Sequence, residues 1–171
     1  MFYCMFYFTC DRSLKILMLV TRGWCCTGAV TGVAQIHDVV FVVCRSSAVL
    51  RFNATTRQRL SDITFMGLRE PFDIAACEQS SALYVAVTGY FDFQKFVWRV
   101  SADGSDIKRW LTAASPHKLS VTSTRLLVTS QANRQLTQYD DKGNELGCIQ
   151  LPDDVKLEHA VESQTGTFIV R

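Results

Sequence analysis

Short apolar segments recur along the chain at nearly constant spacing. The central residues of four of them, Val33, Ile74, Leu119 and Ala160, are 41, 45 and 41 positions apart. A fixed period of this length is typical of repeat proteins, in which each unit folds as one supersecondary element and stacks on its neighbours. The four segments are Gly32-Val33-Ala34, Asp73-Ile74-Ala75, Lys118-Leu119-Ser120 and His159-Ala160-Val161.

Each segment begins a unit that continues with the same succession of elements. A second apolar triplet starts 9, 11, 9 and 9 positions after the first, which fits a short strand, a tight turn and another strand. The second triplets are Phe41-Val42-Val43, Tyr84-Val85-Ala86, Leu127-Val128-Thr129 and Phe168-Ile169-Val170. A third element with apolar ends around polar residues then predicts a half-buried strand at Val49 to Phe52, Val97 to Val100 and Leu136 to Tyr139.

Polar turn segments follow the third element, and a fourth strand closes each unit at Gln58 to Ile63, Ile107 to Leu111 and Glu145 to Leu151. No helical period of 3.6 residues is present, and Pro71, Pro116 and Pro152 lie near the junctions between units, where a missing N–H costs no sheet hydrogen bond. The pattern therefore predicts an all-β partial β-propeller of four-stranded antiparallel blades. A sandwich or an open barrel is the alternative, but neither requires one strand order to recur at constant spacing.

The second unit also resembles a known repeat. Its run Pro71-Phe72-Asp73-Ile74-Ala75, the strand Leu83 to Ala86, the strand Val97 to Val100 and the pair Asp103-Gly104 are similar to the NHL repeat. This resemblance implies a propeller that recognises a protein partner, as in tripartite-motif ubiquitin ligases, where the propeller selects the substrate. No RING-type array of cysteine and histidine is present, so ligase chemistry would belong to a larger system.

The repeats predict three full blades, at residues 28–71, 72–116 and 117–158, and a partial blade at 159–171. Residues 1–27 form an apolar N-terminal segment, in which Leu14 to Val20 predicts an outer strand of a preceding blade. NHL-like propellers usually have six blades, so these units make a little more than half of a ring. We expect either a fragment of a longer propeller or a chain that associates through its open blade edges.

The chain has seven cysteines and a formal net charge of +2, and neither changes the predicted fold. The odd cysteine count and the lack of a CxxC pair argue against a disulfide framework or a zinc site. Cys44, Cys77 and Cys148 fall in or beside apolar runs, where a thiol behaves as a small buried hydrophobe. These features favour a reducing, cytoplasmic location.

The apolar start of the chain lacks a basic region and is interrupted by Asp11, which favours neither a signal peptide nor a membrane span.

Catalytic patterns are not found in the sequence. The three histidines are scattered, and no GxSxG, HExxH, GxGxxG or P-loop motif occurs. Some propellers hydrolyse esters or lactones around a central calcium ion, but the equivalent inner positions here are Gly32, Asp73, Lys118 and His159. One carboxylate cannot supply the 6 to 8 oxygen ligands that calcium takes. We therefore expect no enzyme, metal or cofactor, with a calcium-dependent hydrolase as the minor alternative.

Cations and aromatic side chains gather instead in the loops that the repeat assigns to one face of the propeller. We call this the loop face. A protein partner is the leading expectation, and single-stranded RNA is the alternative, because cations attract carboxylates or phosphates and aromatic rings fill pockets or stack on bases. The opposite rim collects acidic residues. The predicted contact residues are Arg45, Arg69, Tyr90, Phe91, Phe93, Lys95, His117, Lys118, Arg134 and His159.

Overall fold

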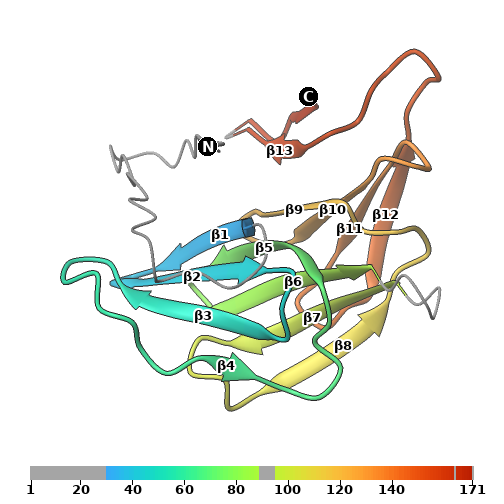
Figure 1. The fold of residues 1–171 in the computed structure, drawn as a ribbon. Coiled ribbons are helices and arrows are strands. Elements are labelled where there is room, and N and C mark those ends of the chain that lie inside the picture. The colour runs from blue at the N-terminus through green and yellow to red at the C-terminus, as the bar shows by residue number, and fades with distance from the viewer. Residues whose placement is uncertain (1–29, 89–94, 164, 171) are drawn as a thin grey trace, which may run out of the picture.

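A computed structural model describes residues 30–88, 95–163 and 165–170 and shows an all-β chain, as the repeat pattern predicts (Figure 1). The first sheet contains β1 (Val30–Ile36), β2 (Val39–Cys44), β3 (Ala48–Asn53) and β4 (Ile63–Thr64). The second contains β5 (Pro71–Cys77), β6 (Ala82–Thr88), β7 (Lys95–Ser101) and β8 (Ile107–Leu111). The third contains β9 (Lys118–Val121), β10 (Leu126–Ser130), β11 (Gln135–Tyr139) and β12 (Glu145–Gln150).

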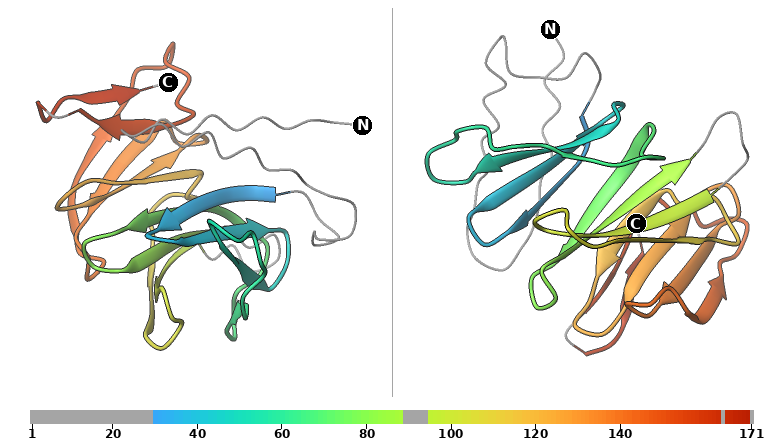
Figure 2. Two further views of the ribbon diagram at one scale, coloured as in Figure 1. Left: turned by 90° about the vertical axis from the view of Figure 1, so that its left-hand side faces the viewer. Right: turned by 90° about the horizontal axis from the view of Figure 1, so that it is seen from below.

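Within each of these sheets the strands are antiparallel and follow one another in chain order, which is the strand order of a propeller blade. A fourth, two-stranded sheet pairs β13 (Ala160–Glu162) with β14 (Phe168–Val170). Figure 2 shows the sheets fanning out from their first strands. The fold is therefore a partial β-propeller. The strand predicted at Leu14 to Val20 lies outside the described residues. Within the described residues, no helix is long and apolar enough to cross a membrane.

The fourth strand of the first sheet differs from the expectation. The pattern predicts a strand from Gln58 to Ile63, whereas regular pairing is confined to β4, with one isolated bridge between Phe52 and Arg59. The backbone of Arg57 adopts a left-handed conformation with φ of 60°. Arg57 follows the turn at 54–56 and precedes the predicted strand, and the apolar pattern overestimates the length of the regular pairing that comes after it.

Apolar side chains fill the spaces between successive sheets. The largest cluster joins Phe41 and Val43 of the first sheet to Leu83 and Val85 of the second. Two further clusters join the second sheet to the third and the third to β13 and β14. A separate cluster, which includes Val42, lies on the other face of the first sheet. Alternation along β2 thus sends its side chains into two different cores, as expected for a strand buried on both faces.

Glycines in two equivalent turns allow the sheets to approach one another closely. Gly104 follows β7 and packs on Ile63, and Gly143 follows β11 and packs on Trp110. Both have positive φ, 83° and 88°, which a glycine adopts without steric cost. A Cβ atom at Gly143 would lie 2.5 Å from Cδ2 of Trp110. The Xaa-Gly pairs predicted as turns therefore also make the contact between one blade and the outer strand of the preceding one.

The cysteines depart from the expectation of buried free thiols. Cys44 is fully buried, but it is disulfide-bonded. Cys77 and Cys148 are free, and Cys148 is exposed because it lies on the outer strand β12, which no other sheet covers among the described residues. The prediction that Cys44 is a reduced thiol is therefore wrong, as is the expected burial of Cys148. The prediction of a cytoplasmic location loses one of its arguments.

Candidate functional site

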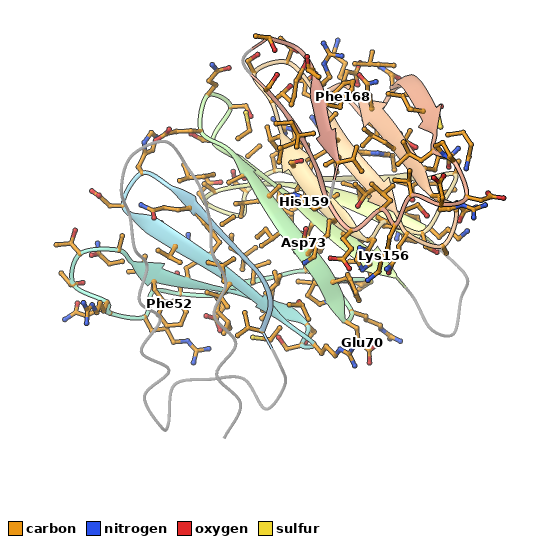
Figure 3. All side chains as sticks on the ribbon, turned by 90° about the horizontal axis from the view of Figure 1, so that it is seen from above. Phe52, Glu70, Asp73, Lys156, His159 and Phe168 are labelled. Carbon is orange, nitrogen blue, oxygen red and sulfur yellow. The ribbon has the colours of Figure 1, made fainter. Side chains whose placement is uncertain are left out.

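The first strands of the sheets lie side by side at the centre of the fold. β5 packs between β1 and β9, and β9 also contacts β13. These strands carry the four equivalent inner positions of the repeat. Figure 3 looks onto this region and labels Asp73 on β5 and His159 just before β13. The repeat therefore places its inner positions correctly, and the chemistry of the centre follows from what those positions contain.

Asp73 is the carboxylate at the centre of the fold among the described residues, and both of its oxygen atoms accept hydrogen bonds. The side chain of Asp73 is buried, with 7% of the residue exposed. Its Oδ1 accepts a hydrogen bond from Nζ of Lys118 at 3.1 Å, and its Oδ2 accepts one from the backbone N–H of Leu119 at 2.8 Å. Burial raises the pKa of Asp73 above its ordinary value, and the charge of Lys118 acts against that rise.

Lys118 connects three sheets at this point. It belongs to the third sheet, forms an ion pair with Asp73 of the second, and donates a hydrogen bond from Nζ to the carbonyl oxygen of Thr31 in the first at 3.4 Å. Its ammonium also lies 6.0 Å from the ring centre of Phe72, a favourable cation–π distance. Lys118 was predicted as a contact residue for a partner, but most of its bonding capacity is used inside the fold.

The innermost strands are also joined by hydroxyl groups. Thr31 donates a hydrogen bond to the carbonyl oxygen of Pro71 at 2.7 Å, and Ser120 donates one to the carbonyl oxygen of Ala160. Gly32 lies opposite Asp73, and a Cβ atom on it would be 2.8 Å from the backbone N of Ile74. The centre is therefore built from close contacts between strands, and a glycine at position 32 makes room for them.

A small hollow opens on the loop face beside this centre. Its volume is about 150 Å³. The rings of Phe72 and His117 are 5.1 Å apart, and Nδ1 of His117 lies 3.3 Å from the carbonyl oxygen of Glu158. The lining residues are Phe72, Ser115, Pro116, His117, Gln131 and Ala132. A space of this size fits one aliphatic side chain rather than a whole small-molecule ligand, for which pockets are usually several times larger.

Some of the other predicted cations form ion pairs with carboxylates, and others do not. Nη2 of Arg134 lies 2.5 Å from Oδ1 of Asp153, so its charge is neutralised locally. Arg45 and Arg69 are exposed and Lys95 is half-buried, and no described carboxylate forms an ion pair with any of these three. The loop face is thus less basic than the sequence indicates.

The remaining predicted contact residues differ in whether and where the structure describes them. His159 is half-buried and immediately precedes β13. Tyr90, Phe91 and Phe93 lie outside the described residues. Phe72 and Gln131, which line the hollow, were not predicted. Phe72 could have been found, because it immediately precedes the inner position of its repeat, whereas nothing in the sequence brings Gln131 near it.

Acidic side chains on the opposite rim are largely engaged in turns. Asp103 accepts hydrogen bonds from the hydroxyl groups of Ser101 and Ser105 and from the backbone N–H of Ser105, and these lower the pKa of Asp103 to about 2. Asp140 makes an equivalent turn, in which hydrogen bonds from Asn144 lower its pKa. These carboxylates stabilise the turn between the third and fourth strands. Within the described ranges no three metal-binding side chains gather.

Comparisons with known proteins define the fold more closely than the function. Neither a protein-family model nor a curated protein matches this chain. Among solved structures it is similar to Kuenenia stuttgartiensis hydrazine synthase, with a TM-score of 0.66 and 15% sequence identity. The match covers 80% of this chain and 40% of that protein, so this chain spans less than half of its length. At this identity the similarity concerns the fold alone, and it agrees with the partial propeller of four-stranded blades.

Proposed function

We propose that this chain is a non-catalytic binding module whose loop face recognises an acidic segment of a protein partner. The observation that carries the proposal is the combination of Arg45 and Arg69, exposed and without ion pairs to described carboxylates, with a mainly apolar hollow on the same face. Exposed cations attract an acidic segment, and a hollow holds one apolar side chain beside it. The resemblance to NHL repeats supports a protein ligand, and substrate selection for a ubiquitin ligase is one setting for such a module.

Two features favour a protein segment over single-stranded RNA. The cations are interspersed with Glu70, Asp153 and Glu158, so the positive surface is discontinuous; a protein segment can place its few carboxylates at Arg45 and Arg69, whereas RNA carries a phosphate at every nucleotide. The hollow is also narrow, whereas RNA bases require open aromatic surfaces on which to stack. Hydrolysis around a central calcium ion finds less support, because the carboxylate of Asp73 is already bonded to Lys118 and to the Leu119 amide.

The proposal can be tested with two fluorescein-labelled probes and fluorescence anisotropy. One probe is a peptide with alternating glutamate and leucine residues, and the other is oligouridine. We expect the peptide to bind, and the double variant Arg45→Ala, Arg69→Ala to bind it about 5-fold to 30-fold more weakly, since each exposed charge contributes roughly 0.5 to 1 kcal/mol. Lys142→Ala is the matched control, because Lys142 is an exposed cation in a turn on the opposite rim.

The outcomes separate the alternatives. An equal loss of binding free energy per removed charge in the double variant and in the single Lys142 control would show that only net charge matters, and it would contradict recognition by the loop face. Binding of oligouridine in preference to the peptide, with affinity falling steeply as salt is added, would replace the protein ligand with RNA. Binding of neither probe at micromolar concentrations would refute the proposal.

A further inference from the structure

The turn after β3 is closed by the side chain of Asn53. Its Oδ1 atom accepts hydrogen bonds from the backbone N–H groups of Thr55 at 3.0 Å and Thr56 at 2.7 Å. The backbone N–H of Asn53 donates to the carbonyl oxygen of Gln58, and its carbonyl oxygen accepts from the N–H of Arg57, both at 2.9 Å. Among the described residues, the amide nitrogen Nδ2 is the one polar group of Asn53 without a hydrogen bond.

The equivalent turn of the third sheet shows that the fold does not need this nitrogen. Asp140 follows the third strand of its repeat as Asn53 does in the first. Its Oδ1 accepts hydrogen bonds from the backbone N–H groups of Lys142 at 2.9 Å and Asn144 at 2.8 Å. A carboxylate therefore closes this kind of turn, and the NH2 group at position 53 has no part in it.

Asn53, Ala54 and Thr55 together form the acceptor triplet for N-linked glycans, in which asparagine is followed two residues later by a threonine or serine. The hydrogen bond from the Thr55 N–H to Oδ1 makes an Asx turn, which holds the threonine next to the side-chain amide. Asn53 is half-buried, Thr55 is exposed, and the Thr55 hydroxyl has no hydrogen bond among the described residues. The turn thus presents both functional groups of the triplet.

The state of Cys44 provides a second, independent observation. This residue lies on β2, beside β3, is fully buried and is disulfide-bonded. Disulfides form and persist in oxidising compartments such as the lumen of the endoplasmic reticulum. N-linked glycans are attached in proteins that enter that compartment. The disulfide and the triplet therefore indicate the same compartment, in contrast to the cytoplasmic location that the cysteine count favours.

We propose that Asn53 is an N-glycosylation site and that this chain matures in an oxidising secretory compartment. In the transfer, Nδ2 forms a bond to the anomeric carbon of a lipid-linked oligosaccharide diphosphate. The bond from that carbon to the diphosphate oxygen breaks, the lipid diphosphate leaves, and a base of the transferase takes the proton lost from Nδ2.

The position of the turn is compatible with binding at the loop face. The N–H of Ala54 donates to the carbonyl oxygen of Asp38 in the turn between β1 and β2, on the rim opposite the loop face. A glycan on Asn53 therefore leaves the loop face open. The inference is independent of ligand binding there, but it replaces the ubiquitin-ligase setting with a secretory one.

Peptide mapping of the chain purified from the cells that produce it tests the site directly. Trypsin releases residues 52–57, because Arg51 and Arg57 bound this peptide. After digestion with peptide-N-glycosidase in heavy-oxygen water, we expect position 53 to be aspartate with one heavy oxygen atom. A parallel digestion without the glycosidase controls for spontaneous deamidation. Recovery of the unmodified peptide alone would overturn the proposal.

Variants of the full chain, translated behind a cleavable signal sequence with microsomes, test which residues the modification needs. We expect wild type to show one gel shift that endoglycosidase removes, Thr55→Ser to keep it, and Thr55→Ala to lose it. Thr56→Ala is the matched control and should keep the shift, because Thr56 is an exposed threonine outside the triplet. Asn53→Asp should lose the shift while the turn stays closed, which separates loss of the glycan from misfolding. No shift in wild type, or a shift that survives Thr55→Ala, would overturn the assignment.

Discussion

Replacing Asp73 with alanine should loosen the centre of the propeller. The substitution leaves Nζ of Lys118 and the backbone N–H of Leu119 without their carboxylate acceptor, in a region where Asp73 itself is 7% exposed. Removing one partner of a buried ion pair typically costs 3 to 5 kcal/mol. The side chain of Lys118 is 29% exposed and can partly recover hydration, so we take the lower end of that range, about 3 kcal/mol.

This loss is large enough to measure as a shift in melting temperature. Unfolding entropy is about 2.1 cal/mol/K per residue, so a cooperative unit of roughly 140 residues loses about 0.3 kcal/mol per degree near its midpoint. A cost of 3 kcal/mol therefore corresponds to a Tm lowered by roughly 10 °C. Urea unfolding followed by tryptophan fluorescence gives the same free energy independently, since Trp98 and Trp110 are packed in the clusters on either side of the second sheet.

Two further variants identify the cause of the loss. Asp73→Asn keeps an oxygen that can accept the Leu119 N–H, so it should cost about 1 kcal/mol. In a double-mutant cycle with Lys118→Met, the coupling between positions 73 and 118 should be at least about 1 kcal/mol. An Asp73→Ala variant within 1 kcal/mol of wild type, or a cycle with no coupling, would falsify the assignment of this pair as the central link between sheets.

Two other predictions concern the turns between the third and fourth strands. Gly143→Ala should lower the free energy of unfolding in urea by about 3 kcal/mol, since it combines a left-handed backbone with a clash against Trp110. The control Gly147→Ala should be nearly neutral, because only one atom lies within 4 Å of the position that its Cβ would take. Equal costs in the two variants would contradict the packing argument. The pKa of Asp103 is about 2, below the ordinary value, so its contribution to stability is complete above about pH 4 and is lost as the pH falls toward 2. Asp103→Asn should therefore flatten the acid side of the curve of melting temperature against pH. The control is Asp154→Asn, which should leave the shape of that curve unchanged, because Asp154 is exposed and has no hydrogen bond or ion pair among the described residues.

The strand order of the fold was predictable because it repeats. The apolar triplets at Val33, Ile74, Leu119 and Ala160 all lie on innermost strands or at their start, as the spacing indicated. Periodicity fixes which segments pair, but it does not show where pairing stops. Regular pairing of the fourth strand of the first sheet covers only Ile63 and Thr64, and the apolar pattern that begins at Gln58 does not indicate this boundary.

The chemistry of the candidate site was less predictable, because it depends on distances between blades. Lys118 and Asp73 are equivalent positions in neighbouring repeats, and the sequence gives no sign that one neutralises the other. The pairing of Arg134 with Asp153 is likewise set by where two loops meet. Net charge and loop position could place cations on a face, but they could not tell which cations remain unpaired.

The turn glycines bear on the order in which the blades can form. Gly104 rests on Ile63 and Gly143 rests on Trp110, so each turn closes against an outer strand that precedes it in the chain. A blade emerging during synthesis therefore meets a completed template, whereas the earlier blade needs nothing from the later one to seat its own turn. For these two turns, the dependence runs from the earlier blade to the later one. It also means that an error in one outer strand is passed to the blade made after it.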